Sequence, residues 1–124
     1  MRIVWKHLPL AMHKDAPGAH RAAAAAHLQG KFWEFHDRLF ANQSSLNTAR
    51  YMKYARELGL DVDRFAKDMS ELSADTAKAI EADKSKANSL GITGTPAFFV
   101  NGRYLSGAKP FEEFAKVIDA ELSK

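Results

Sequence analysis

The 124-residue sequence contains no cysteine. The thiolate of cysteine is the nucleophile of thiol–disulfide exchange and a principal ligand of structural zinc. Without cysteine, the chain cannot form a disulfide, hold a thiolate metal centre or perform thiol chemistry by itself. The absence alone says nothing about the cellular compartment.

Long apolar runs and charge tracts of one sign are absent as well. No stretch approaches the ~18 consecutive apolar residues of a membrane-spanning helix, and the first residues lack the apolar segment of a signal peptide. Lys and Arg (18) are interleaved with Asp and Glu (15), for a net charge of +3, whereas nucleic-acid binders cluster their basic residues. The sequence therefore predicts no membrane span, no signal peptide and no nucleic-acid partner, and it leaves the localisation unknown.

The first and middle parts of the chain carry different periodicities. Residues 2–7 alternate between the two faces of an extended chain, which predicts a strand. Apolar spacings of three and four, alanine-rich composition and capping residues predict helices through the middle. These are expected at residues 19–29, at residues 31–41, after Ser45 or Asn47, after Asp61, and from Ser73 to Leu90.

The C-terminal part predicts a β-hairpin and a closing helix. Phe98-Phe99-Val100 is typical of a strand, and Asn101-Gly102 is a strong signal for a two-residue hairpin turn. Residues 103–106 are then expected to return antiparallel. Pro110 suits the start of a helix, whose expected buried stripe is Phe111, Phe114, Ile118 and Leu122. The order of strand, helices, hairpin and helix predicts an α/β fold.

Four segments together resemble the DsbA-like family of thioredoxin-fold oxidoreductases. These are residues 2–10, 30–40 and 91–102, and the Lys109-Pro110-Phe111-Glu112 run. The resemblance implies a single DsbA-like domain over 1–124, in which 1–10 and 91–124 form the thioredoxin-like part and about 15–90 form an all-helical insertion. It also suggests a periplasmic or extracytoplasmic location.

The sequence departs from the family at its beginning. The family starts with a strand, a Cys-x-x-Cys loop and a helix, and this chain starts after them, so the resemblance implies an incomplete thioredoxin-like fold with no catalytic residues to carry over. Gly94, Thr95 and Pro96 match the family's cis-proline loop. The resemblance implies a cis Thr95–Pro96 bond that presents backbone groups to an extended peptide.

Other candidate sites have weaker support from the sequence. His20 and His27 share a helix face, but two turns separate them by about 10 Å. We therefore predict no metal site, and no Gly-rich phosphate loop or other motif indicates a cofactor. His36, beside Glu34 and Asp37, could in principle do acid–base work; a packed histidine beside solvated carboxylates is the favoured interpretation.

Two functions from different classes follow. The first is a DsbA-like domain that is redox-inactive in this form and keeps the cis-proline loop for an extended peptide or protein. The alternative is a non-enzymatic protein–protein interaction module that uses the helical insertion.

The missing strand also leads to a prediction about assembly. In the thioredoxin fold this strand lies between residues 2–7 and 97–101, so its loss leaves two open edges. We expect a homo-oligomer, such as a strand-swapped or edge-paired dimer, or direct pairing of residues 2–7 with 97–101.

Overall fold

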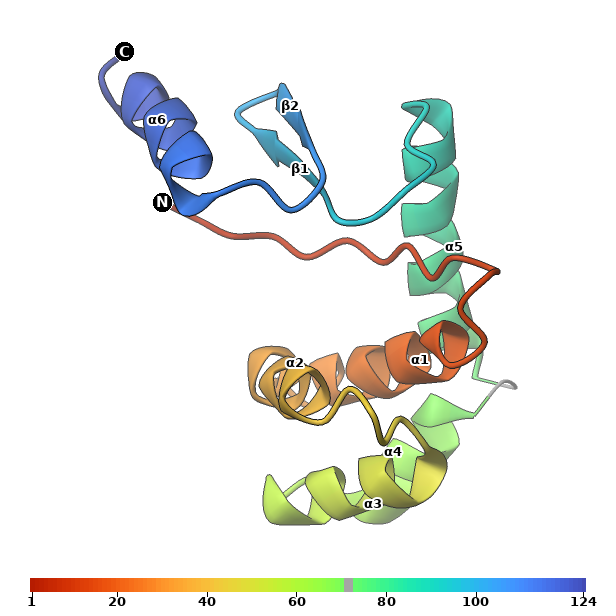
Figure 1. Ribbon diagram of the computed structural model, residues 1–124. Helices are drawn as coiled ribbons and strands as arrows, with labels where there is room; N and C mark the ends of the chain where they lie inside the picture. Colours follow the sequence, from red (N-terminus) through yellow and green to blue (C-terminus); the bar gives the residue numbers. More distant parts are fainter. Residues whose placement is uncertain (71–72) are drawn as a thin grey trace. The chain divides into compact units, whose positions relative to one another are not determined.

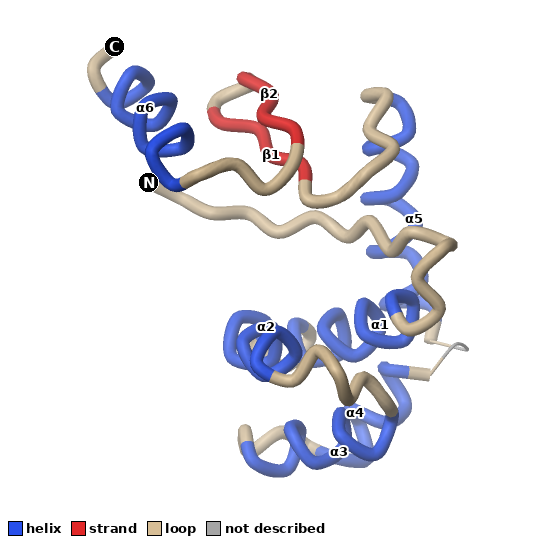
Figure 2. Tube along the Cα trace, in the orientation of Figure 1, coloured by secondary structure: helices blue, strands red, loops and turns tan. Residues whose placement is uncertain are grey.

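The computed structural model describes residues 1–70 and 73–124 (Figures 1 and 2). In these residues, helices come first and are followed by a β-hairpin and a last helix, which is the predicted order without its first strand. The elements are α1 (Ala16–His27), α2 (Phe32–Ala41), α3 (Thr48–Glu57), α4 (Val62–Met69), α5 (Ala74–Ser89), β1 (Ala97–Val100), β2 (Arg103–Ser106) and α6 (Phe111–Leu122).

The chain divides into two compact units. The helical unit is Met1–Lys86, and the hairpin unit is Ala87–Lys124. The boundary falls inside α5. The prediction that the whole chain is one domain stays a prediction.

Alanine and aromatic side chains form the core of the helical unit. Helix α1 packs against α2, α3 and α4, and its run Ala22–Ala26 is buried. Small alanine side chains let helix backbones approach closely, and bulky rings fill the space beyond them. Phe35 and Phe65 are both 0% exposed, with ring centroids 5.4 Å apart. This cluster is the main apolar core of the unit.

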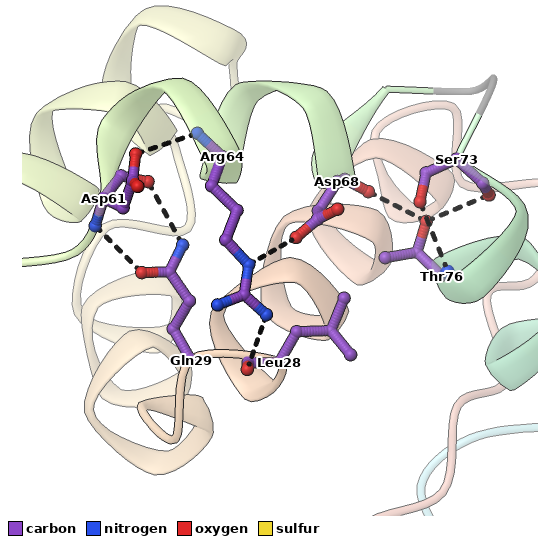
Figure 3. Close-up of polar contacts among 7 residues, drawn as sticks. All are labelled: Leu28, Gln29, Asp61, Arg64, Asp68, Ser73 and Thr76. Carbon is purple, nitrogen blue, oxygen red and sulfur yellow. Dashed lines mark hydrogen bonds and ion pairs between the residues drawn. The ribbon is translucent and has the colours of Figure 1, made fainter.

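Helix α4 is capped at its first turn and tied there to the end of α1 (Figure 3). The Asp61 carboxylate accepts from the backbone N–H of Arg64 at 3.0 Å, which satisfies a helix N-terminal donor. Gln29 donates to the Asp61 carbonyl at 3.1 Å and accepts from the Asp61 N–H at 2.8 Å. The Arg64 guanidinium donates to the Leu28 carbonyl at 3.2 Å.

A second polar contact joins the end of α4 to the start of α5 (Figure 3). The Thr76 hydroxyl, on a residue only 1% exposed, donates to the Asp68 carbonyl at 2.9 Å. That carbonyl lies in the last turn of α4, where backbone acceptors lack helical partners. Thr76 thus satisfies a backbone acceptor and buries its own hydroxyl without a polar penalty.

The hairpin unit follows the predicted turn chemistry. Asn101 and Gly102 take φ values of 48° and 84°, as a two-residue hairpin turn requires. Strands β1 and β2 pair antiparallel, with Val100 opposite Arg103 and Phe99 opposite Tyr104. Helix α6 packs on β1, and the rings of Phe98 and Phe114 meet edge to face at 4.7 Å.

The structure corrects the strand predicted at residues 2–7. These residues belong to no sheet, because the sheet in the described part of the chain consists of β1 and β2. Alternating side chains indicate an extended chain, but a strand also needs a hydrogen-bonded neighbour. Instead, His7 is buried while Ile3 and Val4 remain 67% and 56% exposed.

The buried stripe predicted for the last helix is also partly wrong. Phe111 and Leu122 are 79% and 69% exposed, whereas Val117 is buried and Phe114 and Ile118 are half-buried. Helix α6 meets β1 through Phe114, and its apolar positions at Phe111 and Leu122 are not covered by this packing.

Candidate functional site

The predicted cis-proline loop lies directly before β1. Gly94, Thr95 and Pro96 are all exposed, and the Thr95–Pro96 peptide bond is cis. The Pro96 carbonyl accepts from the Gly107 N–H at 2.9 Å, which extends the pairing of the hairpin by one residue. A side chain at Gly94 would meet no atom within 4 Å of its Cβ.

The register shows which backbone groups of β1 point away from β2. Antiparallel pairs alternate between hydrogen-bonded and non-hydrogen-bonded, and the Gly107–Pro96 bond and the two-residue turn give the same phase. Phe98 and Val100 therefore exchange hydrogen bonds with β2. The N–H and C=O groups of Ala97 and Phe99 face the other way, and we call these four groups the free edge of β1.

No hydrogen bond pairs the free edge among the residues that the structure describes. The Thr95 backbone N–H and C=O, immediately before it, are likewise unpaired there. Sequence reasoning singled out the loop but missed Ala97 and Phe99. The Asn-Gly turn carried the necessary signal, because a two-residue turn fixes the hydrogen-bonding phase of both strands.

One face of the hairpin packs on α6, and the opposite face does not. Phe98 points to α6, where it meets Phe114. Phe99 lies on the opposite face and stacks against Tyr104, with centroids 5.1 Å apart and exposed fractions of 48% and 49%. No charged side chain lies on β1, so an approaching strand meets an uncharged edge.

Glu121 ties the hairpin turn to the last turn of α6. Its carboxylate lies 2.9 Å from the Lys124 ammonium and 3.6 Å from the Arg103 guanidinium, and it accepts from the Asn101 amide at 3.4 Å. The hydrogen bond from Lys124, supported by Asn101 and Arg103, lowers the pKa of Glu121. The carboxylate thus contacts both the residue in the turn after β1 and the first residue of β2.

The structure also brings together two histidines, His7 and His20, that the sequence analysis did not pair. The Nδ1 atoms of His7 and His20 are 2.9 Å apart, and the Trp5 indole donates to His7 Nδ1 at 3.3 Å. Burial lowers the pKa of His7, and it lowers that of His20 to about 4. Thirteen residues separate the pair along the chain, and no local pattern announces the contact.

His36 lies among aromatic rings and beside one exposed carboxylate. His36 packs on the rings of Trp5, Phe32, Trp33 and Phe40. Its Nδ1 lies 3.0 Å from the carboxylate of Asp37, which is 79% exposed, so the pair is open to solvent. Among the described residues, no three His, Cys, Asp or Glu side chains converge so that they could hold a metal ion.

Comparison with known proteins assigns the family. The family model of the DSBA-like thioredoxin domain matches residues 1–119 of the chain. The chain belongs to this family. A thioredoxin-like oxidoreductase from Silicibacter pomeroyi DSS-3 has a similar structure, with a TM-score of 0.83 and 28% identity, over 98% of this chain and 68% of that one. This DsbA-like chain therefore has the thioredoxin-like fold and is related to the oxidoreductases of its family.

The curated relatives that this chain matches are much longer proteins. The chain is 41% identical over 119 residues to the Na(+)/H(+) antiporter NhaA 3 of Salinispora tropica, covering 95% of this chain and 18% of the antiporter. It is 39% identical over 120 residues to the Na(+)/H(+) antiporter NhaA of Herminiimonas arsenicoxydans, covering 97% and 19%. The chain thus spans less than a fifth of these relatives. No helix among the described residues is long and apolar enough to cross a membrane.

Proposed function

We propose that this DsbA-like chain binds an extended polypeptide at the free edge of β1 and performs no thiol–disulfide exchange of its own. The observation that carries the proposal is the pair of unpaired peptide groups at Ala97 and Phe99, continued by those of Thr95. An unpaired edge accepts an extended peptide by strand addition, in which backbone hydrogen bonds supply affinity.

The second half of the proposal rests on chemistry. Exchange requires a thiolate that attacks a disulfide sulfur and a second thiolate that leaves. The sequence holds no cysteine, so the chain supplies neither. Gly94, Thr95 and Pro96 then serve in polypeptide binding alone. The relatives are named as sodium–proton antiporters, but none of the features described in the hairpin unit supports sodium–proton exchange by this chain.

An NMR titration tests the binding. Reduced, carboxymethylated insulin B chain is added to the ¹⁵N-labelled chain as an extended peptide without free thiols. We expect the largest shifts at the amides of Thr95, Ala97 and Phe99, because these donors face the free edge. Shifts confined to the helices would contradict the proposal.

Two substitutions at one position separate backbone from side chain. Phe99→Ala keeps the N–H on the free edge, whereas Phe99→Pro removes it and leaves the β2 hydrogen bonds intact. One hydrogen bond is worth about 1 kcal/mol, so Phe99→Pro should bind the peptide about fivefold more weakly than Phe99→Ala. Equal affinities would refute strand addition. Insulin reduction by the chain above the buffer rate would refute the absence of thiol exchange.

A second copy of the chain is another extended partner for the same edge. Antiparallel pairing of two copies would place Ala97 of each opposite Phe99 of the other and satisfy both edges by symmetry. Light scattering tests this proposal: a mass of twice 13.8 kDa that the insulin peptide reduces toward the monomer supports it. A monomer that still binds the peptide refutes the dimer and leaves the proposed function intact.

The alternative is an interaction module in the helices. Helix α2 exposes Trp33 by 43% and Phe40 by 55%, which gives this alternative an apolar surface. Trp33→Ala and Phe40→Ala should leave peptide affinity unchanged if the free edge is the site. If Trp33→Ala and Phe40→Ala lost peptide binding while Phe99→Pro kept its affinity, the binding site would lie on α2 instead.

A further inference from the structure

The segment before α1 is held on the helical unit by a few specific contacts. The Trp5 ring packs on His20, Phe32 and His36 at centroid distances of 6.3, 5.6 and 5.2 Å. The backbone N–H of His7 donates to Asp83 of α5 at 2.9 Å. In contrast, Met1, Ile3 and Val4 are more than half exposed. The attachment of this segment is therefore concentrated at Trp5 and His7.

The hydrogen bonds around His7 assign its neutral tautomer. An indole N–H can only donate, so the Trp5 bond at 3.3 Å makes His7 Nδ1 an acceptor. The proton of His7 then lies on Nε2. His20 Nδ1, 2.9 Å away, must donate to the same atom. The arrangement therefore requires His7 to remain unprotonated at Nδ1.

We propose that His7 and His20 form an acid-sensitive latch that holds the segment around Trp5 on the helical unit at neutral pH and releases it on acidification. A proton taken up by His7 goes to Nδ1, where it opposes the indole N–H and breaks that hydrogen bond. Because His20 Nδ1 also carries a hydrogen in this arrangement, the same proton leaves two N–H donors facing each other and breaks the hydrogen bond between the rings.

The charged groups around the pair decide the direction of the effect. Asp83 faces His7 from α5 and favours its protonation, but it also binds Lys6 at 3.8 Å. His27, on α1, opposes protonation of His7, and the two latch histidines oppose each other's charge. His36 reaches the group from α2 through the Trp5 ring. Burial outweighs the single carboxylate, so the neutral latch persists below the usual histidine range.

Tryptophan fluorescence tests the latch. The chain has two tryptophans, so Trp33→Phe leaves Trp5 as the reporter. From pH 7.5 downward, we expect a red shift of Trp5 emission with a midpoint between about pH 4 and pH 6.5, while the helical circular dichroism is unchanged. These limits are the pKa of His20 and the ordinary histidine value. Trp5 emission that stays constant until the helices unfold would overturn the proposal.

Substitutions in the same background identify the titrating groups. His7→Gln removes the titratable ring and should abolish the red shift in this pH range, whereas His13→Gln, at an exposed loop residue, should leave the midpoint unchanged. Should His7→Gln not fold, NMR titration of the histidine ring protons in the unsubstituted chain decides the matter. Ordinary titration of both His7 and His20, or a His13→Gln variant that loses the transition, would refute the latch.

Discussion

Replacing Phe35 with alanine should remove a large part of the stability of the helical unit. Phe35 is 0% exposed, and its ring lies 5.4, 5.8 and 6.3 Å from those of Phe65, Tyr54 and Tyr51. Phe→Ala changes in packed cores cost about 3–5 kcal/mol, the loss of burial adding to that of the cavity. Native domains are stable by only about 5–15 kcal/mol, so this single change consumes much of the margin.

Phe40→Ala is the matched control, because Phe40 lies on the same helix and is 55% exposed. Its ring contacts His36 at 4.6 Å, so a loss below about 1 kcal/mol is expected for this surface position. Any difference between the variants then reports burial and not helix propensity, since both change phenylalanine to alanine in α2.

Urea unfolding followed by far-ultraviolet circular dichroism measures both variants. The midpoint should fall strongly for Phe35→Ala at a nearly unchanged slope, because the surface exposed on unfolding changes little. Phe35→Leu should recover part of the loss by refilling the cavity. A loss below about 1 kcal/mol for Phe35→Ala, or equal losses at both positions, would refute the assignment of Phe35 to the core.

Three further predictions concern pH, a cap and the hairpin. The folded-state pKa of His20 is about 4, below its ordinary 6.5, so the unfolded chain binds the proton more readily. The contribution of His20 to the free energy of unfolding is therefore full above pH 6.5 and falls by about 3 kcal/mol toward pH 4, at 1.36 kcal/mol per pH unit. Urea midpoints measured at both pH values will show this loss. Asn47→Ala should cost about 1 kcal/mol by calorimetry, because the Asn47 side chain accepts from the Arg50 N–H at 3.0 Å. Gly102→Ala should destabilise the hairpin by about 1 kcal/mol because φ is 84°, whereas Gly94→Ala should not; NMR shifts of β1 and β2 compare the two.

Elements specified by local chemistry could be predicted from the sequence. Asp61 caps α4 as expected, and Asn47, one of the two residues considered, caps α3, because a side-chain oxygen meets a backbone N–H three residues later. The Asn101-Gly102 turn follows in the same way from its positive φ values. Each of these features needs only residues that are close in the sequence.

Features that depend on distant partners could not be predicted in the same way. Residues 2–7 have the alternation of a strand, but alternation does not supply a neighbouring strand. Phe111 and Leu122 have helical spacing with Phe114, but only packing decides how far along α6 the contact extends. The His7–His20 pair arises from a chain reversal that neither residue type specifies.

In the function that we propose, peptide binding at the free edge of β1 does not depend on catalysis. Thiol exchange resides in a side chain, and one missing residue type removes it. Strand addition resides in peptide groups, which every residue except proline carries in full. Pro96 leaves the free edge complete, since its carbonyl pairs with Gly107 and the alternation turns its missing N–H toward β2, where one ladder hydrogen bond is absent. The donors and acceptors of Ala97 and Phe99 therefore depend on the turn and register of the hairpin and not on the presence of a cysteine.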